Sequence, residues 1–419
     1  MKKRLDFCEF FSGGGLARLG LAENWNCIFA NDISRMKGEI YNKNFSNESN
    51  LLIEDIRQIK AIDIQNNPIL AWASFPCQDL SLAGNGKGIN GERSSTFWDF
   101  WRIINEFDEQ KRTVPIVVIE NVPGLLTSGK GKDFNSLLSS IVSSGYYVGA
   151  IIIDAKYFVP QSRKRLFIVA IRKEILIPAH LQTSEYSDKL ILGAFSKLDE
   201  KVKANWIWWN LPTPESTAIE LRNIIEKEPS GISWHSDSET SKIINKMSLI
   251  NYNKVVLAQK NYDETIGTIY FRTRKSNGKS RVFAEVRLDG LSGCLRTPAG
   301  GSSRQTLIII SKKRIRTRLL SPREVARLMG VDDNYILPDK YNDTYHIMGD
   351  AVVVQAVRWL DEKLLQPIVG VFSQDNVEIS ECQLINQSSL ANYPIPQENL
   401  SNNTRKILKK KPIQLETMV

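Results

Sequence analysis

Short apolar runs recur in the N-terminal part of the chain, and each ends in a polar or glycine-containing turn. Such runs are typical of strands buried on both faces of a parallel sheet. Between them, residues 94–109 carry aromatic and aliphatic side chains at helical spacing, most simply as part of a core. The predicted strands are residues 5–11, 27–32, 69–75, 114–119, 147–154 and 166–171. Strands alternating with helical segments predict an α/β fold with a doubly wound, mostly parallel sheet.

The alternation is lost after residue 172, which suggests a second domain. Residues 173–315 have their own tryptophans and a basic, β-prone stretch at 268–275, and we expect a smaller, irregular domain there. The first domain would occupy residues 1–172 and resume at 316–368. The remaining residues, 369–419, are rich in Asn, Gln, Ser and Lys, which predicts a polar, basic and partly disordered tail.

Two helices are expected in the returning segment. Ser321, Pro322 and Glu324 have the spacing of an N-cap, a first-turn proline and a capping box. Residues 351–365 form an apolar, amphipathic pattern that predicts a helix packed on the first domain.

Composition narrows the classes of function. The chain has 419 residues and a net charge of +9, which favours a polyanionic partner, although a solvated basic surface would give a similar figure. No run of about 18 apolar residues or signal-peptide pattern is present, so we expect a cytoplasmic protein that does not contact membranes. The five cysteines are widely spaced and fit neither a disulfide framework nor a metal site.

Two reactive side chains follow predicted strands. Cys77 lies in the turn Pro76-Cys77-Gln78 after residues 69–75, and Glu120 ends the run 114–119. In parallel α/β sheets, ligands bind at the carboxyl ends of strands. A buried core thiol and a loop-capping carboxylate remain the alternatives for these two residues.

A glycine turn and two acids indicate a nucleotide-like ligand. Residues 12–15, Ser-Gly-Gly-Gly, separate the first strand from a helical segment, so that backbone N–H groups can approach a ligand. Asp32 and Asp55 each follow a short apolar stretch, where a carboxylate can bind ribose hydroxyls or cap a helix. We interpret these features as a site for an adenosine-containing cofactor without a pyrophosphate.

Alternating polar residues suggest an anion site. Gln161, Arg163 and Arg165 would share one face of an extended segment, suited to an anion or a polar base, although charged runs are often solvated surfaces.

Six motifs together resemble those of the cytosine-5 DNA methyltransferases. They are Phe10-Phe-Ser-Gly-Gly-Gly15, Pro76-Cys-Gln78, Glu120-Asn-Val122, Gln161-Ser-Arg-Lys-Arg165, Arg318-Leu-Leu-Ser-Pro-Arg-Glu324 and Gly349-Asp-Ala-Val352. The resemblance covers residues 4–365. It implies a Rossmann-like domain that binds S-adenosyl-L-methionine, a small target-recognition domain at 173–315, and double-stranded DNA between them.

The resemblance also implies roles for individual residues. The catalytic residues would be Cys77, Glu120, Arg163 and Arg165. The cofactor residues would be Phe11, Ser12, Gly13, Gly15, Asp32, Ile33, Asp55, Ile56, Pro76, Asp350, Ala351 and Val352. The DNA contacts would be Gln78, Ser81, Gln161, Arg272, Arg274 and Arg304.

The expected reaction requires both a thiol and an acid. Carbon 5 of cytosine becomes nucleophilic when a thiolate adds to carbon 6 and ring nitrogen 3 takes a proton. We expect Cys77 to attack, activated by Arg163 or Arg165, and Glu120 to be kept partly protonated by an apolar pocket. The target base would be flipped out of the duplex, with residues 84–91 closing over it.

One position departs from the family. Where its members often have Gly-Asn before Ser or Ala and Val, this chain has Gly349-Asp350-Ala351-Val352. The acid adds charge near the cofactor's end and weakens the assignment of Asp350 to the cofactor site.

Other functions remain open at this stage. A tRNA cytosine methyltransferase would share most motifs, but its recognition region is shorter. Methylation of an exocyclic amine would need an Asn/Asp-Pro-Pro-aromatic motif, and the matching turn here is Phe-Pro-Cys. A DNA-binding module without catalysis is disfavoured because Cys77, Glu120 and both arginines are present. We expect a monomer, with a restriction endonuclease as a plausible functional partner.

Overall fold

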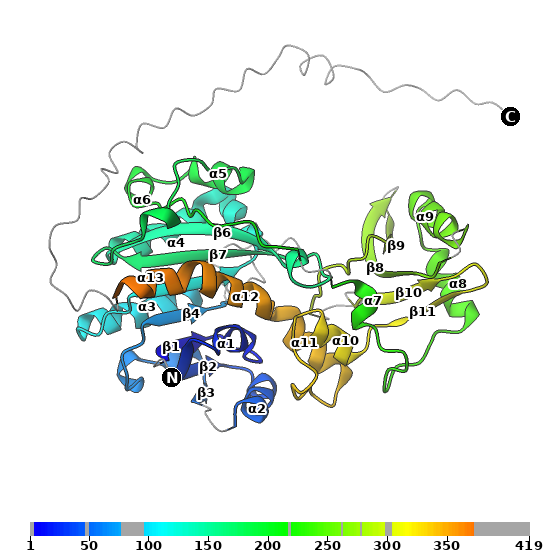
Figure 1. Cartoon of the computed structure of the whole chain (residues 1–419), viewed down its shortest axis with the longest axis horizontal. Helices are drawn as coiled ribbons and strands as arrows, with labels where there is room; N and C mark the ends of the chain where they lie inside the picture. Colours follow the sequence, from blue (N-terminus) through cyan, green and yellow to red (C-terminus); the bar gives the residue numbers. More distant parts are fainter. Residues whose placement is uncertain are drawn as a thin grey trace, which may run out of the picture. The chain divides into compact units, whose positions relative to one another are not determined.

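Two sheets organise the chain in the computed structural model shown in Figure 1. The structure describes residues 4–46, 50–76, 96–216, 219–260, 263–276, 279–297 and 304–372. Cys77, Gln78, Ser81, the predicted loop at 84–91 and most of the predicted tail lie outside these residues. Within the described part, no helix combines the length and apolarity that membrane crossing requires.

The large sheet confirms the predicted fold class. Its strands are β1 (Leu5–Phe10), β2 (Trp25–Asp32), β3 (Leu51–Ile53), β4 (Leu70–Ala73), β5 (Ile116–Asn121), β6 (Tyr146–Asp154) and β7 (Lys164–Arg172). The order is β3-β2-β1-β4-β5-β7-β6, and only β7 runs antiparallel to its neighbours. The strand order reverses direction between β1 and β4, so the carboxyl ends of these strands are the expected place for a ligand.

Apolar residues cover both faces of the large sheet. Phe7, Trp72 and Val118 belong to one hydrophobic cluster, and their neighbours Cys8 and Val117 belong to the other. Alternate residues of a strand point to opposite faces, so the near-continuous apolar runs are explained by two cores.

Helices cover each of these cores. The first core includes residues of α1 (Leu16–Leu21), α2 (Arg35–Asn44), α10 (Pro322–Arg327), α11 (Tyr341–Asp350), α12 (Val354–Leu360) and α13 (Gln366–Phe372). The second includes residues of α3 (Thr96–Glu109), α4 (Lys132–Ser143), α5 (Lys189–Phe195) and α6 (Glu200–Lys203). Short helices are η1 (Ile56–Gln58), η2 (Ala61–Asp63), η4 (Pro123–Gly131), η5 (Ala155–Tyr157), η6 (Ala179–Leu181) and η7 (Asp361–Leu365). The aromatic stripe predicted as core is buried in α3.

The C-terminal helices return to the first core, as expected from the sequence. Figure 1 shows α12 and α13 running across the large sheet. A Cβ atom at Gly20 of α1 would lie 2.5 Å from Cβ of Val357 in α12, so glycine is needed for this close packing. The predicted helix at 351–365 begins only at Val354, because Ala351 is in an extended conformation, and it continues into the π-helical η7.

A second sheet corrects the expectation of an irregular domain. It consists of β8 (Thr265–Ser276), β9 (Lys279–Arg287), β10 (Thr306–Ile310) and β11 (Ile315–Leu319), in the antiparallel order β11-β10-β8-β9. The other helices of this region are α7 (Leu221–Ile224), α8 (Asp237–Ile244) and α9 (Leu249–Lys260). The sheet extends to residue 319, beyond the predicted boundary at 315, because β11 pairs with β10 along its whole length.

A buried ion pair joins β11 to α10. Both guanidinium NH groups of Arg318 donate to the carboxylate of Glu324, at 2.7 and 2.6 Å, and neither side chain is exposed. Glu324 also accepts from the backbone N–H groups of Ser321 and Glu226, both at 2.8 Å. The predicted capping box is therefore confirmed, and its carboxylate also neutralises a buried arginine.

We predict that Glu324→Gln lowers the free energy of unfolding by about 3 kcal/mol, because it leaves the Arg318 charge buried without a counter-ion. Urea denaturation measures this change. Asp333→Asn is the matched control: it breaks the exposed pair between Arg327 and Asp333 and should cost less than about 1 kcal/mol. Equal losses in the two variants would contradict the prediction.

Candidate active site

The turn after β1 has the backbone conformation expected of a ligand-binding turn. Gly13 and Gly15 have φ values of 56° and 78°, and Phe11 has φ 58°, which is strained for a side chain of this size. The N–H of Gly13 donates to Asp32 Oδ2 at 2.8 Å, and that of Ser34 donates to Oδ1 at the same distance. Asp32 at the end of β2 therefore fixes the turn and precedes α2, and its oxygens retain further lone pairs.

Residues from the far end of the sequence support the same turn. Tyr335 Oη donates to the carbonyl of Gly14 at 2.6 Å. A Cβ atom at Gly14 would lie 2.6 Å from Cγ2 of Ile347, so only glycine fits beside α11. By contrast, no atom lies within 4 Å of a Cβ built at Gly13. The turn is packed on one side and open on the other.

A buried carboxylate lies at the base of this turn. Glu9 in β1 accepts hydrogen bonds from the backbone N–H of Arg18 and from Tyr41 Oη, both at 3.2 Å. The guanidinium of Arg18 donates to Tyr41 Oη and stacks over the ring of Phe45, at 4.4 Å. Burial raises the pKa of Glu9 to about 8, and the Arg18 charge opposes this shift.

The predicted cofactor residues fit a ligand at the open side of the turn. Ser12 Oγ is buried without a hydrogen-bond partner, which favours a bound polar group. Ile33, next to Asp32, exposes 68% of its surface and could contact a flat apolar group. Pro76 is also exposed, whereas Ile56 and Val352 are buried.

The other predicted acid has a local partner. The carboxylate of Asp55 caps η1 through the N–H of Arg57, and it pairs with the Arg57 guanidinium. This hydrogen bonding lowers the pKa of Asp55. Asp55 is therefore ionised and available as an acceptor at neutral pH.

Glu120 is a buried carboxylate at the end of β5. It is 5% exposed, and its Oε1 lies 2.9 Å from Nε of Arg165, at the start of β7. Burial raises the pKa of Glu120, against the opposing effects of Arg165, Arg163 and a hydrogen bond from Ser74. The sequence predicted a carboxylate at this strand end. Its surroundings are not the expected apolar pocket, because Arg165, Arg163 and Ser74 act on it, and its catalytic role stays a prediction.

The turn that leads to Cys77 lies next to Glu120. Nδ2 of Asn121, the residue after Glu120, donates to the carbonyl of Phe75 at 3.3 Å. Phe75 is two residues before Cys77, and the parallel strands β4 and β5 end at the same sheet edge.

Arg163 connects three segments of the chain. Its guanidinium donates to the carbonyls of Leu295, Gly349 and Ala351, at 2.8, 2.8 and 2.6 Å. It also donates to Sγ of Cys294 at 3.3 Å. This arginine is buried, and its observed partners are structural; its predicted effect on Cys77 is not tested by the described residues.

Cys294 was not predicted from the sequence. Burial acts to raise its thiol pKa, but the charges of Arg163 and Arg165 outweigh this effect, so the pKa is lowered. No sequence signal indicated this contact, since Cys294 and Arg163 are 131 residues apart.

The predicted DNA contacts have different environments. Gln161 is fully buried. Its Nε2 donates to the carbonyl of Leu328, and its Oε1 accepts from the N–H of Leu295, which favours a structural role over the predicted DNA contact. Arg272 and Arg274 in β8 have side chains about half exposed and lie beside Glu285. Arg304 lies over the ring of Tyr341 at 5.6 Å.

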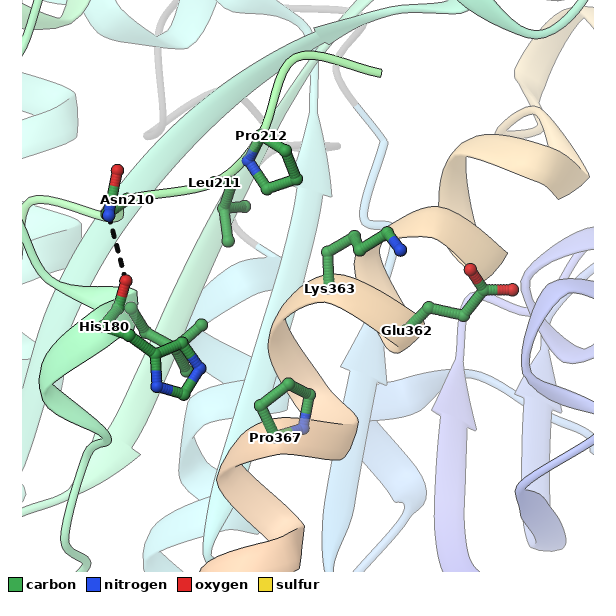
Figure 2. Close-up of a pocket in the computed structure, with 8 residues that line it drawn as sticks. His180, Asn210, Leu211, Pro212, Glu362, Lys363 and Pro367 are labelled. Carbon is green, nitrogen blue, oxygen red and sulfur yellow. Dashed lines mark hydrogen bonds between the residues drawn. The ribbon is translucent and has the colours of Figure 1, made fainter. Parts of the chain in front are cut away.

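A pocket of about 480 Å³ lies away from these residues (Figure 2). Its lining comes from three segments of the chain: His180, Leu181, Asn210, Leu211, Pro212, Glu362, Lys363 and Pro367. It contains no predicted site residue. A much smaller cavity, of about 10 Å³, is lined by Arg163, Arg165 and Val352 among others. The described residues contain no cluster of three or more His, Cys, Asp or Glu that could hold a metal ion.

Known proteins are similar to this chain over most of its length. The family model for C-5 cytosine-specific DNA methylases matches residues 5–366. A Type II methyltransferase from Lactococcus lactis subsp. cremoris, M1.ScrFI, is 26% identical, with 85% of this chain and 77% of that protein covered. M.DsaV from Dactylococcopsis salina is 24% identical over 94% of this chain and 95% of its own length.

Solved structures share the fold. The Entamoeba histolytica methyltransferase EhMeth superposes with a TM-score of 0.56 at 17% identity, covering 88% of this chain and 99% of that one. The S. pombe Dnmt2 methyltransferase gives a TM-score of 0.55 at 19% identity, covering 87% and 99%.

We predict that Glu9→Gln flattens the pH dependence of stability. As the pH rises from 4.5 to about 8, this carboxyl is ionised in the unfolded chain but protonated in the folded one, so the wild-type free energy of unfolding falls. Glutamine has no such proton to lose. Urea denaturation across this range should show a smaller fall in Glu9→Gln, whereas Glu39→Gln, an exposed control on α2, should match the wild type.

Proposed function

Because the chain belongs to the family of C-5 cytosine-specific DNA methylases and is a DNA cytosine-5 methyltransferase, we propose that it methylates a flipped-out cytosine through a covalent Cys77 adduct. The methyl donor in this proposal is S-adenosyl-L-methionine. When bound, it supplies an electrophilic methyl group on a sulfonium.

The observation that carries the proposal is the environment of Glu120. A carboxyl that is buried at the end of β5, with a raised pKa, keeps its proton to a higher pH than an exposed glutamate does. The bond from Asn121 to Phe75 supports a position for Cys77 beside this acid. A nucleophile and an acid at one edge are what addition to a cytosine ring requires.

The thiolate of Cys77 forms a bond to carbon 6 of the base while Glu120 gives its proton to ring nitrogen 3. Carbon 5 is then nucleophilic and would form a bond to the methyl group, whose bond to the donor sulfonium breaks to leave a neutral thioether. A base removes the proton from carbon 5, and the bond between sulfur and carbon 6 breaks, which restores the double bond and releases the thiolate. Ring nitrogen 3 returns its proton to Glu120. Arg165, at 2.9 Å from Glu120, would orient the carboxyl throughout.

Residues of the turn would hold the cofactor. Ser12 and Gly13 offer an unpartnered hydroxyl and an open face, and Asp32 and Asp55 offer carboxylate oxygens to polar groups. Exposed Ile33 would contact the adenine ring. Ala351 and Val352 follow Asp350 at the end of α11, and they would line the same cofactor site.

DNA would contact the second sheet. We propose that residues 173–315 form most of the target-recognition region, with Arg272 and Arg274 as phosphate contacts because their side chains are exposed. Since the two relatives described above are named Type II methyltransferases, we further propose a role in restriction and modification.

We predict that cells expressing the chain contain cytosines that resist bisulfite conversion within one short, recurring DNA motif. A Cys77→Ser control should remove this protection, because serine is not ionised at neutral pH and cannot form the adduct. Bisulfite sequencing of plasmid and genomic DNA is the measurement. Full conversion, with a protein that binds the cofactor, would exclude DNA as the substrate and direct the same assay to RNA.

We predict that Glu120→Gln lowers the turnover number by about 10² to 10⁴-fold, because glutamine cannot donate the proton to nitrogen 3. The wild-type turnover should fall as the pH rises through the raised pKa of Glu120, and the residual activity of the variant should lack this dependence. Tritiated methyl transfer to DNA measures both effects. Glu109→Gln, at the exposed end of α3, is the control, and unaltered turnover in Glu120→Gln would refute the acid role.

A further inference from the structure

The acid that departs from the family pattern has two partners. At the end of α11, Asp350 Oδ2 lies 2.7 Å from Nζ of Lys37 in α2. The hydroxyl of Thr297 donates to the other oxygen, Oδ1. One carboxylate thus bonds residues that are 313 and 53 positions away in the sequence.

Both partners belong to segments next to the proposed cofactor site. Lys37 lies in the first turn of α2, whose N-cap, Ser34, donates its own N–H to Asp32. Asp350 is less than one turn after Ile347, which packs against Gly14 of the glycine turn. The Asp350 carboxylate therefore connects α11, which supports the turn, to α2, which follows Asp32.

Thr297 belongs to a segment packed directly on α11. A Cβ atom at Gly349 would lie 2.7 Å from the backbone N of Thr297 and 2.8 Å from the carbonyl carbon of Arg296, so the backbones touch there. Arg163 binds Leu295 and Gly349 at the same crossing. Asp350 extends this contact to α2, because its carboxylate bonds both Thr297 and Lys37.

The charge of Asp350 suits this position. The side chains of Lys37 and Asp350 are 18% and 39% exposed, so water screens their attraction only in part. Asparagine, frequent in the family at this position, could accept one hydrogen bond but would leave the Lys37 ammonium without a counter-charge.

We propose that Lys37, Asp350 and Thr297 form a latch that holds residues 294–297 and α11 against α2, with Lys37 and Thr297 as positioning residues for cofactor binding. This inference rests on the proposed function, because it takes the turn at residues 12–15 as the cofactor site. Neither Lys37 nor Thr297 needs to touch the cofactor: opening the latch would loosen the support of the turn.

The test is S-adenosyl-L-methionine binding by calorimetry, combined with steady-state methylation kinetics on the full chain. Lys37→Ala and Asp350→Asn should each raise the KM for S-adenosyl-L-methionine about three- to tenfold, with a smaller change in kcat. The double variant should be no worse than either single variant, because both remove the same bond. Thr297→Val should act in the same direction, and Lys37→Arg should retain binding.

Salt and a matched control separate the latch from a general loss of stability. Arg35→Ala breaks the exposed pair with Glu39 on the same helix and should bind as the wild type does. At about 1 M salt, the difference between the wild type and Lys37→Ala should vanish. Thermal unfolding without cofactor gives the stability of each variant.

Three outcomes would overturn the inference: wild-type affinity in both Lys37→Ala and Asp350→Asn, additive effects in the double variant, or lower unfolding temperatures without a change in KM. If the wild-type protein does not bind S-adenosyl-L-methionine, the proposed function itself fails. If it binds and methylates while the latch variants behave as the wild type, only the latch fails.

Discussion

A buried guanidinium must find acceptors for its N–H groups, and that of Arg163 finds them on segments that are distant in the sequence. The carbonyls of Leu295, Gly349 and Ala351 converge on it, while its backbone N–H donates to Asp154 at the end of β6. Removing any of these segments would leave a buried charge poorly solvated. This requirement joins the large sheet, the segment before residue 298 and the end of α11 at one place.

The same junction determines the electrostatics of the proposed reaction site. Arg163 and Arg165 lie close enough that each arginine's charge acts on Glu120, and the two charges oppose the effect of burial on this acid. The balance leaves Glu120, which pairs with Arg165, with a raised pKa, whereas Cys294, which accepts a hydrogen bond from Arg163, has a lowered pKa. The pKa values of Glu120 and Cys294 thus shift in opposite directions. Burial outweighs the arginine charges at Glu120, whereas the arginine charges outweigh burial at Cys294.

Local patterns predicted much of this arrangement. Asp32 and Glu120 were identified at strand ends because apolar runs define where buried strands stop. Ser321 and Glu324 were identified because a capping box depends on residues three positions apart. The helix at 351–365 was predicted to start too early, since the extended conformation of Ala351 accompanies its bond to Arg163, which no local pattern encodes.

Contacts between distant residues account for what the sequence could not predict. The regular second sheet depends on pairing β8 with β10, and the burial of Gln161 depends on partners at Leu295 and Leu328. The partners of Asp350 are another case, because a single acid in a motif does not indicate Lys37 or Thr297. Side chains reach such partners only after the elements have packed.

The support of the glycine turn has a consequence for synthesis of the protein. Gly14 is held by Tyr335 and Ile347, Gly20 of α1 packs on Val357, and Trp25 of β2 donates to Asp361 at 2.7 Å. A ribosome makes the turn first and these partners more than 300 residues later. The nascent chain therefore holds an incompletely packed turn until the entire recognition region has been translated. Fragments that end within that region lack the packing that supports the turn in the full chain.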